Sequence, residues 1–308
     1  MKILVIGASG HVGAYLVNEL VRAGHDVDTV MRGIKKPYGY DEHVWSKVNI
    51  MHFDRNALLA SDVIERGNYD VICDLIAFEL DSVKTLVSKI KNDAFYLLIG
   101  SIWTYENKMY LPVDENHPKN SVQTYGREKG KMEEYLLSLS QAGKLRCCIV
   151  HPGHVSGKEW MPISPQGNLD SSVFDKLKKG EEVVLPFLGL PTIQHVHAQD
   201  LAKVLTACID NQDKANGEAF IAVAEHCMTL RAICKELYAY YNQTPNLRFV
   251  EWAEFERIVG KENADVAMDH IGHSPCCTME KAKRVLGVQM QYSIMDIYKE
   301  YLEYQATK

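Results

Sequence analysis

A tyrosine and a lysine four residues apart are the side chains in this sequence whose types and spacing most directly suggest chemistry. Tyr125 and Lys129 lie in YGREK, at the start of a segment whose apolar residues recur at helical spacing. A separation of four residues places both side chains on one face of a helix. A nearby ammonium group lowers the pKa of a phenol by favouring its phenolate, which makes tyrosine a usable base near neutral pH. The pair therefore predicts a proton-transfer site.

A serine upstream of this pair could complete the site. Ser101 directly follows the apolar run 94–99 and Gly100, and the run predicts a strand. Ligands of open parallel sheets bind outside the carboxyl ends of the strands. We therefore expect the Ser101 hydroxyl near the Tyr125 phenol, where it could hydrogen-bond the same substrate oxygen.

The segment KILVIGASGHVG, residues 2–13, predicts a dinucleotide site. A short apolar strand, a turn with glycines at three-residue spacing and an amphipathic helix that ends near Gly24 follow one another. Glycine allows a tight turn and a close approach of the backbone to a pyrophosphate, whose charge is bound by the free N–H groups of the first helical turn. The predicted cofactor-binding residues of this turn are Gly7, Ser9, Gly10, His11, Val12 and Gly13.

The end of the second predicted strand bears on which dinucleotide is bound. NAD sites usually place an acidic residue there to hold the ribose hydroxyls. Here the strand 26–31 is followed by Arg32, with Lys35 and Lys36 close behind. Because an arginine suits a 2′-phosphate, the sequence favours NADP, with NAD as the second choice.

Alternating strands and helices predict the architecture. Strands are expected at 2–6, 26–31, 48–53, 69–75, 94–99 and 220–223, and helices from about Asn56, at 83–90, from Tyr125, from Asp200 as N-cap to about Ile209, at 229–241 and at 293–304. This rhythm predicts an α/β fold of the Rossmann type, a doubly wound parallel sheet with right-handed crossovers and helices on both faces.

Composition and charge limit the classes of binding partner that we expect. The chain has 308 residues and a net charge of −6, with no basic run, so nucleic acid is not an expected partner. No apolar stretch approaches the length of a membrane span, and the first strand begins at Lys2, so no signal peptide is expected. Eight cysteines form no C-x-x-C pair, which is typical of reduced thiols in a cytoplasmic protein.

The chain as a whole resembles the extended short-chain dehydrogenases/reductases of the NAD-dependent epimerase/dehydratase family. The segments that carry the resemblance are GASGHVG (7–13), Asp54, GSIWTYE (100–106), YGREK (125–129), HPGHVSG (151–157), HVHAQDLA (195–202) and EKAKRVLG (280–287). The resemblance implies a nucleotide-binding domain at 1–157 that is completed by about 195–223. Residues 158–194 and 224–308 would then form a smaller C-terminal substrate lobe.

The resemblance also implies roles for single residues. Tyr125 would be the general acid/base, Ser101 would position the substrate oxygen, and Lys129 would bind the nicotinamide ribose and lower the Tyr125 pKa. The cofactor would further be contacted by Asp54 at the adenine, by the backbone of Leu75, Ile76 and Ala77, and by Pro152 and Gly153 beside the nicotinamide.

Two departures from the family pattern bear on the substrate. The 4,6-dehydratases carry an Asp-Glu pair after the catalytic Ser/Thr, whereas Ile102 and Trp103 stand here, so dehydration is not expected. UDP-sugar epimerases usually hold the diphosphate with arginines, but one such position is Ile193 and the other region, 265–277, contains no Arg or Lys. A diphosphate would lose its charge-assisted bonds. A small sugar, polyol or carbonyl substrate is therefore favoured.

Candidate substrate contacts are Trp103, His154, Trp160 and Asn168. His154, where many relatives have asparagine, could orient a hydroxyl or shuttle a proton, or could be a loop histidine bonded to backbone. Trp160 could line the pocket or pack in the lobe core. A group of potential zinc ligands comprises His270, His273, Cys276 and Cys277, but its spacing matches no standard finger. No metal is expected, and the group is predicted to lie in a loop near the substrate mouth.

The sequence thus predicts an NAD(P)-dependent oxidoreductase or epimerase that transfers hydride reversibly at a carbinol or carbonyl carbon of a small substrate. The alternatives are a nucleotide-sugar (UDP-sugar) 4-epimerase and a non-catalytic cofactor-sensing or RNA-binding relative on the same fold. Met and Tyr residues along 229–241 and 293–304 suit either a core or the contact of a homodimer.

Overall fold

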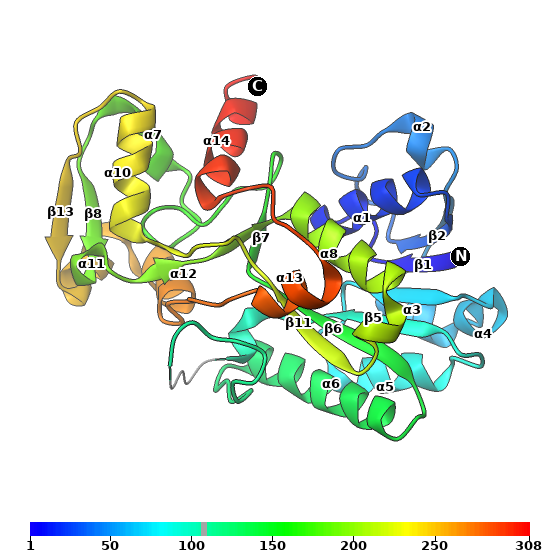
Figure 1. Ribbon diagram of the computed structural model, residues 1–308. Helices are drawn as coiled ribbons and strands as arrows, with labels where there is room; N and C mark the ends of the chain where they lie inside the picture. Colours follow the sequence, from blue (N-terminus) through cyan, green and yellow to red (C-terminus); the bar gives the residue numbers. More distant parts are fainter. Residues whose placement is uncertain (106–109) are drawn as a thin grey trace.

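The computed structural model describes residues 1–105 and 110–308, and its centre is a seven-stranded parallel sheet (Figure 1). The strands lie in the order β3-β2-β1-β4-β5-β6-β11. Their bounds are Lys2–Ile6 (β1), Asp26–Met31 (β2), Asn49–His52 (β3), Val71–Asp74 (β4), Phe95–Ile99 (β5), Arg146–Pro152 (β6) and Glu218–Ala222 (β11). This order confirms the predicted doubly wound fold. Glu106, the last residue of the GSIWTYE segment, lies outside the described residues.

Helices cover both faces of the sheet because alternate strand residues point to opposite sides and are apolar on both. Ile3 and Val5 pack with one set of helices, whereas Leu4 and Ile6 pack with the other. The first set comprises α1 (His11–Arg22), α2 (Glu42–Trp45), α8 (Ala198–Asp210), α9 (Gln212–Ala215) and α13 (Glu280–Leu286). The second set comprises α3 (Arg55–Ala60), α4 (Val63–Gly67), α5 (Leu80–Ser88) and α6 (Thr124–Gln141).

A smaller lobe with its own hydrophobic core lies beside the sheet (Figure 1). Its helices are α7 (Ser172–Lys179), α10 (Leu230–Tyr240), α11 (Trp252–Val259), α12 (Lys261–Ile271) and α14 (Ile294–Gln305). Short strand pairs join it to the sheet or brace it, namely β7 (His154–Ser156) with β10 (His195–His197), β8 (Val183–Pro186) with β13 (Leu247–Val250), and β9 (Thr192–Ile193) with β12 (Met228–Thr229). Among the described residues, no helix combines the length and apolarity that a membrane crossing needs.

Two details differ from the sequence-based expectation. Helix α13 packs in the core of the nucleotide-binding domain, because Ala282 and Leu286 belong to the same buried cluster as β1 and α8. His197, not Asp200, caps α8, since its Nδ1 accepts the N–H of Gln199 at 3.1 Å. The Asp200 carboxylate instead accepts the backbone N–H groups of Gln291 and Tyr292, at 2.8 and 2.9 Å, and ties the C-terminal segment to this helix.

Candidate functional site

The glycine turn between β1 and α1 leaves no room for a side chain at its centre. A Cβ on Gly13 would lie 2.5 Å from the Gly7 carbonyl oxygen and 2.6 Å from the Ala8 Cα, and these are backbone atoms that cannot move aside. Gly7 has a φ of +93°, in the region that glycine adopts without strain. The turn therefore brings the first N–H groups of α1, which have no partner within the helix, to the carboxyl edge of the sheet.

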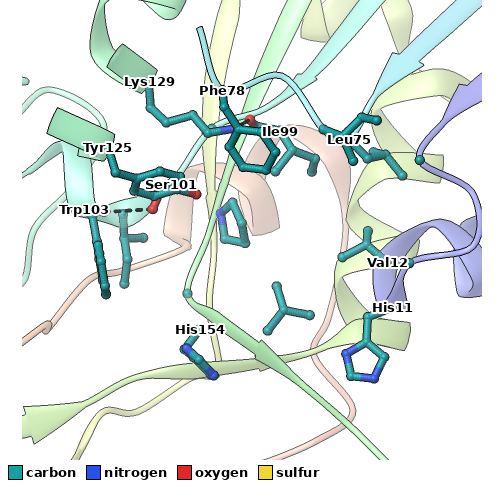
Figure 2. A pocket seen from close by; sticks show the side chains of 18 of the residues that line it. His11, Val12, Leu75, Phe78, Ile99, Ser101, Trp103, Tyr125, Lys129 and His154 are labelled. Carbon is teal, nitrogen blue, oxygen red and sulfur yellow. Dashed lines mark hydrogen bonds between the residues drawn. The ribbon is translucent and has the colours of Figure 1, made fainter. Parts of the chain in front are cut away.

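A cavity of about 580 Å³ lies at this edge, between the glycine turn and the smaller lobe (Figure 2). It brings together most of the residues that the sequence singled out. These are Gly7, Gly10, His11, Val12, Gly13, Leu75, Ile76, Ser101, Trp103, Tyr125, Lys129, Pro152, Gly153, His154 and Trp160. Phe78, which the sequence analysis did not single out, and His270 also line it. His270 was expected in a loop near the substrate mouth, but it lies in helix α12.

Ser101, Tyr125 and Lys129 meet at one end of this cavity. Helix α6 begins at Thr124, so that Tyr125 and Lys129 lie on one face of its first two turns. The Ser101 hydroxyl lies beside the Tyr125 phenol, with which it hydrogen-bonds, and it accepts the backbone N–H of Trp103 at 3.2 Å (Figure 2). The Lys129 ammonium is 5.7 Å from the centroid of the Tyr125 ring. The predicted catalytic set is thus assembled in space.

The expected lowering of the Tyr125 pKa is wrong for this structure. Burial raises the pKa of Tyr125, and its hydrogen bond with Ser101 offsets only part of this rise, although 39% of the residue's surface remains exposed. Lys129 is fully buried and donates to the carbonyl oxygens of Ala77 and Ile99, both at 2.7 Å. Burial also lowers the pKa of Lys129 to about 8. The hydrogen-bond partners of the Lys129 ammonium are thus backbone carbonyls and not the Tyr125 phenol oxygen.

A second hollow of about 640 Å³ continues the cavity along the sheet edge, because the two share Gly7, Gly10, Ile76 and Phe78. Its lining includes the predicted Ser9, Arg32 and Asp54. Arg32 is exposed directly after β2, and the Asp54 carboxylate caps α3 by accepting the N–H of Ala57 at 2.8 Å. An elongated groove that starts at a glycine turn fits a dinucleotide. Among the predicted cofactor-binding residues, Ala77 alone lies outside both linings. Its carbonyl oxygen instead accepts a hydrogen bond from Lys129.

A buried charged pair that the sequence analysis did not identify lies at the second hollow, whose lining includes Arg55. Asp74, at the end of β4, is fully buried and contacts Arg55 Nη1 with both carboxylate oxygens at 2.7 Å. It also accepts the hydroxyl of Tyr96 at 2.7 Å and the backbone N–H of Ile76 at 3.4 Å. The signal in the sequence is an acidic residue inside the apolar strand VICDLIA, which must find a partner when buried.

Several aromatic side chains line or border the cavity. The ring of Trp103 lies edge-on to Tyr125 at 5.9 Å and stacks on His273 at 4.6 Å. The ring of His154 lies 5.5 Å from that of His270, whose Nδ1 bonds the Gly167 carbonyl oxygen at 2.7 Å. Burial, with His270 nearby, lowers the pKa of His154 to about 3, so its imidazole is neutral at physiological pH.

Of the two remaining predicted substrate contacts, Trp160 lines the cavity and Asn168 does not. Trp160 lines the cavity, with its ring 4.4 Å from that of His11, and is not part of the lobe core. Asn168 lies outside the lining: it is fully buried, and its amide oxygen accepts the Ser164 hydroxyl at 2.6 Å and the Asp170 N–H at 3.0 Å. It fixes a turn of the lobe instead of facing the cavity.

The cavity carries little charge. Lys129 contributes its only Lys, Arg, Asp or Glu side chain among the described residues. Ile193, at a position where an arginine would suit a diphosphate, is buried in β9. Within the described part of the chain, no group of three or more His, Cys, Asp or Glu side chains is arranged to hold a metal ion. His270 and His273 instead flank the ring of Trp103.

Comparison with known proteins matches part of the chain to one family. Residues 74–222 match the model of the NAD dependent epimerase/dehydratase family. The chain is 25% identical over 304 residues, 96% of its length and 76% of the relative's, to the chloroplast stem-loop binding protein of 41 kDa b of Arabidopsis thaliana. It is 24% identical to a putative UDP-glucose 4-epimerase of Methanocaldococcus jannaschii, over 65% of this chain and 71% of that protein.

Solved structures share the fold over the full length. Pal from Bacillus thuringiensis superposes with a TM-score of 0.77 at 18% identity, covering 100% of this chain and 99% of that one. The UDP-glucose 4-epimerase of Thermotoga maritima, solved with UDP-glucose, superposes with a TM-score of 0.72 at 18% identity and the same coverage. In residues 74–222, in its doubly wound sheet and in its glycine turn, the chain is thus similar to the NAD-dependent epimerase/dehydratase family.

Proposed function

We propose that this protein is an NAD(P)-dependent oxidoreductase or epimerase that transfers hydride reversibly at a carbinol or carbonyl carbon of a small, neutral substrate. The observation that carries the proposal is the meeting of Ser101, Tyr125 and Lys129 in a cavity that continues into a groove fit for a dinucleotide. When bound, the nicotinamide would supply or accept the hydride, and the side chains of the chain would move the proton.

Each member of the set has a distinct part. The raised pKa of Tyr125 keeps its phenol protonated near neutral pH, so it suits the general acid that protonates the oxygen of a carbonyl substrate. The Ser101 hydroxyl, beside the phenol, would hydrogen-bond the same oxygen and orient it. Lys129 ties α6 to the strand ends through the carbonyls of Ala77 and Ile99, which fixes the phenol relative to the groove. The resemblance adds a contact from Lys129 to the nicotinamide ribose.

The walls of the cavity favour a small and uncharged substrate. Among the described residues, Lys129 is the one Lys or Arg side chain of this lining, and two of its three N–H donors already bond carbonyls, so the lining offers little positive charge to a diphosphate. Trp103 and Trp160 offer flat apolar surfaces, and the neutral imidazole of His154 can orient a hydroxyl. These features suit a sugar-like or carbonyl compound without phosphate groups.

Arg32 favours NADP over NAD within this proposal. Its side chain is exposed in the second hollow, directly after β2, where it can bind a 2′-phosphate. The solved UDP-glucuronic acid 4-epimerase of Bacillus cereus, by contrast, is a complex with NAD. The test is to denature the purified protein and to analyse the supernatant for NAD(H) and NADP(H). A retained stoichiometric cofactor favours an epimerase, and an empty protein that binds NADPH in calorimetry favours an exchanging oxidoreductase.

The test of the reaction is a reductase assay. NADPH oxidation should accompany reduction of some member of a panel of unphosphorylated sugar aldehydes, ketoses and small aldehydes, and UDP-glucose should give no binding heat. Failure of every neutral carbonyl, together with saturable UDP-glucose binding and conversion to UDP-galactose, would replace this proposal by its first alternative. The name of the Methanocaldococcus jannaschii relative is what supports that alternative.

The second alternative is a non-catalytic RNA-binding protein, and the name of the Arabidopsis thaliana relative supports it. The net charge of −6 opposes it, because phosphate contacts need basic side chains. Filter binding of a stem-loop RNA at increasing salt distinguishes the two. Salt-dependent retention together with absent cofactor binding would favour the RNA-binding protein.

A further inference from the structure

We propose that His151 is a positioning residue for Ser101, whose backbone N–H it accepts with Nδ1 in a tautomer that Glu133 selects. The proposal rests on the proposed function for the role of the Ser101 hydroxyl. His151 lies on β6, is fully buried and does not line the cavity, so any effect on the reaction passes through Ser101.

The hydrogen bonds around Ser101 assign Nδ1 as the acceptor. His151 Nδ1 lies 3.0 Å from both the nitrogen and the carbonyl oxygen of Ser101. That oxygen already accepts the N–H and the hydroxyl of Thr104, at 3.2 and 3.0 Å. Among the described residues, the Ser101 N–H has only His151 Nδ1 as an acceptor. Without it, a buried backbone donor would have no partner, which folded proteins avoid.

Glu133 fixes the opposite side of the imidazole. Its Oε2 lies 2.9 Å from His151 Nε2, and its Oε1 lies 3.1 Å from Lys119 Nζ. Burial acts to raise the pKa of Glu133, but His151 and Lys119 together lower it, so the group is a carboxylate. A carboxylate only accepts, so Nε2 carries the proton that faces Glu133, and the Ser101 N–H requires Nδ1 to keep its lone pair.

The space around the imidazole holds it in this position. A Cβ on Gly100 would lie only 2.4 Å from His151 Nδ1, so a glycine is needed for the ring to reach the backbone of Ser101. The Tyr105 ring packs edge-on against the imidazole, with the ring centroids 5.4 Å apart. The imidazole therefore fixes the backbone at the end of β5, from which the Ser101 hydroxyl points to Tyr125.

The chain provides a matched control in His197. This buried histidine also accepts a backbone N–H with Nδ1, from Gln199, and also faces a carboxylate with Nε2, that of Glu300 at 2.7 Å. It caps α8 and lies outside the cavity lining. His151→Leu and His197→Leu therefore remove the same kind of contacts, but only the first removes the support of Ser101.

A double-mutant cycle tests the link to the reaction. His151→Leu should slow hydride transfer roughly ten- to hundredfold, because a small misplacement of a reacting group costs about that much. NADPH affinity should change less than about threefold, and His151→Asn, which keeps an acceptor near Nδ1, should recover much of the rate. In a Ser101→Ala background, His151→Leu should have little further effect. Equal losses with and without Ser101, or an equal loss in His197→Leu, would make His151 a purely structural residue.

A measurement without substrate keeps this proposal separate from the proposed function. Nitrogen-15 NMR of the imidazoles, assigned by the signals lost in His151→Asn, should give an unprotonated Nδ1 and a protonated Nε2. The amide hydrogen of Ser101 should exchange faster in His151→Leu than in the wild type or in His197→Leu. A protonated Nδ1, or unchanged exchange, overturns the proposal whatever the activity. Wild-type protein that transfers no hydride overturns the proposed function and leaves these two results standing.

Discussion

Removing the charge of Asp74 should destabilise the protein strongly, because this carboxylate balances a buried arginine. Asp74 is fully buried, and 16% of the Arg55 side chain is exposed. The Asp74→Asn substitution keeps the shape but removes the negative charge that faces Arg55 Nη1 at 2.7 Å on both oxygens. It also weakens the hydrogen bond that Tyr96 donates at 2.7 Å.

The magnitude follows from the burial of the pair. Breaking a buried ion pair by removing one partner costs about 3–5 kcal/mol, because the other charge stays buried without compensation. The partial exposure of Arg55 places Asp74→Asn near the lower end, at about 3 kcal/mol of unfolding free energy. Removing both charges in Asp74→Asn/Arg55→Met should cost less than Asp74→Asn alone, since no buried charge is left.

Urea unfolding followed by circular dichroism measures these differences. The matched control is Asp213→Asn, which removes a fully exposed carboxylate that pairs with Arg146 at 3.1 Å and should cause no measurable change. An Asp74→Asn protein that unfolds at the wild-type urea midpoint would contradict the expected destabilisation. A double variant as destabilised as the sum of the two single variants would contradict the coupling between the two charges.

Three further predictions concern the groove and its charges. Gly13→Ala should abolish binding of NADPH and NADH in calorimetry, because the new Cβ would lie 2.5 Å from the Gly7 carbonyl oxygen. The control Gly130→Ala should bind both cofactors normally, because its new Cβ would have its nearest neighbour at 3.4 Å. Arg32→Ser should weaken NADPH binding roughly tenfold and leave NADH binding nearly unchanged; equal losses would contradict a 2′-phosphate contact. Lys129 has a folded pKa of about 8, below its unfolded value, so the unfolded chain binds more protons between about pH 8 and 10.4. Wild-type stability relative to Lys129→Met should therefore rise by about 3 kcal/mol over that range in urea unfolding, and parallel pH profiles would contradict the pKa.

The parts of the site that the sequence predicts are the local ones. The glycine turn is a strand, a turn and a helix in succession, and each has its own residue pattern. Tyr125 and Lys129 lie on one helix, so their spacing alone brings them together. Ser101 follows from the rule that the carboxyl ends of parallel strands share an edge. Helices α10 and α14 are likewise predicted, because their apolar residues recur at helical spacing.

The parts that the sequence does not predict depend on partners far apart in the chain. An aspartate inside an apolar strand indicates that a partner must exist, but not that Arg55 and Tyr96 supply it. The direction of the Tyr125 pKa was wrong for the same reason, because burial raises it and the side chains around the phenol, such as Phe78 and Trp103, come from other elements. The prediction of Asn168 as a substrate contact was wrong, because the turn that contains it directs its amide inward, to Ser164.

Hydride transfer by Tyr125→Phe tests the central claim most directly. The substitution removes only the phenol oxygen, so the ring can still pack edge-on against Trp103. With NADPH and the best neutral carbonyl substrate of the wild type, we predict a loss of roughly a hundredfold to ten-thousandfold in turnover, the range of general acid–base catalysis, with NADPH binding unchanged in calorimetry. Turnover near the wild-type rate, with the cofactor still bound, would contradict the claim that this tyrosine moves the proton.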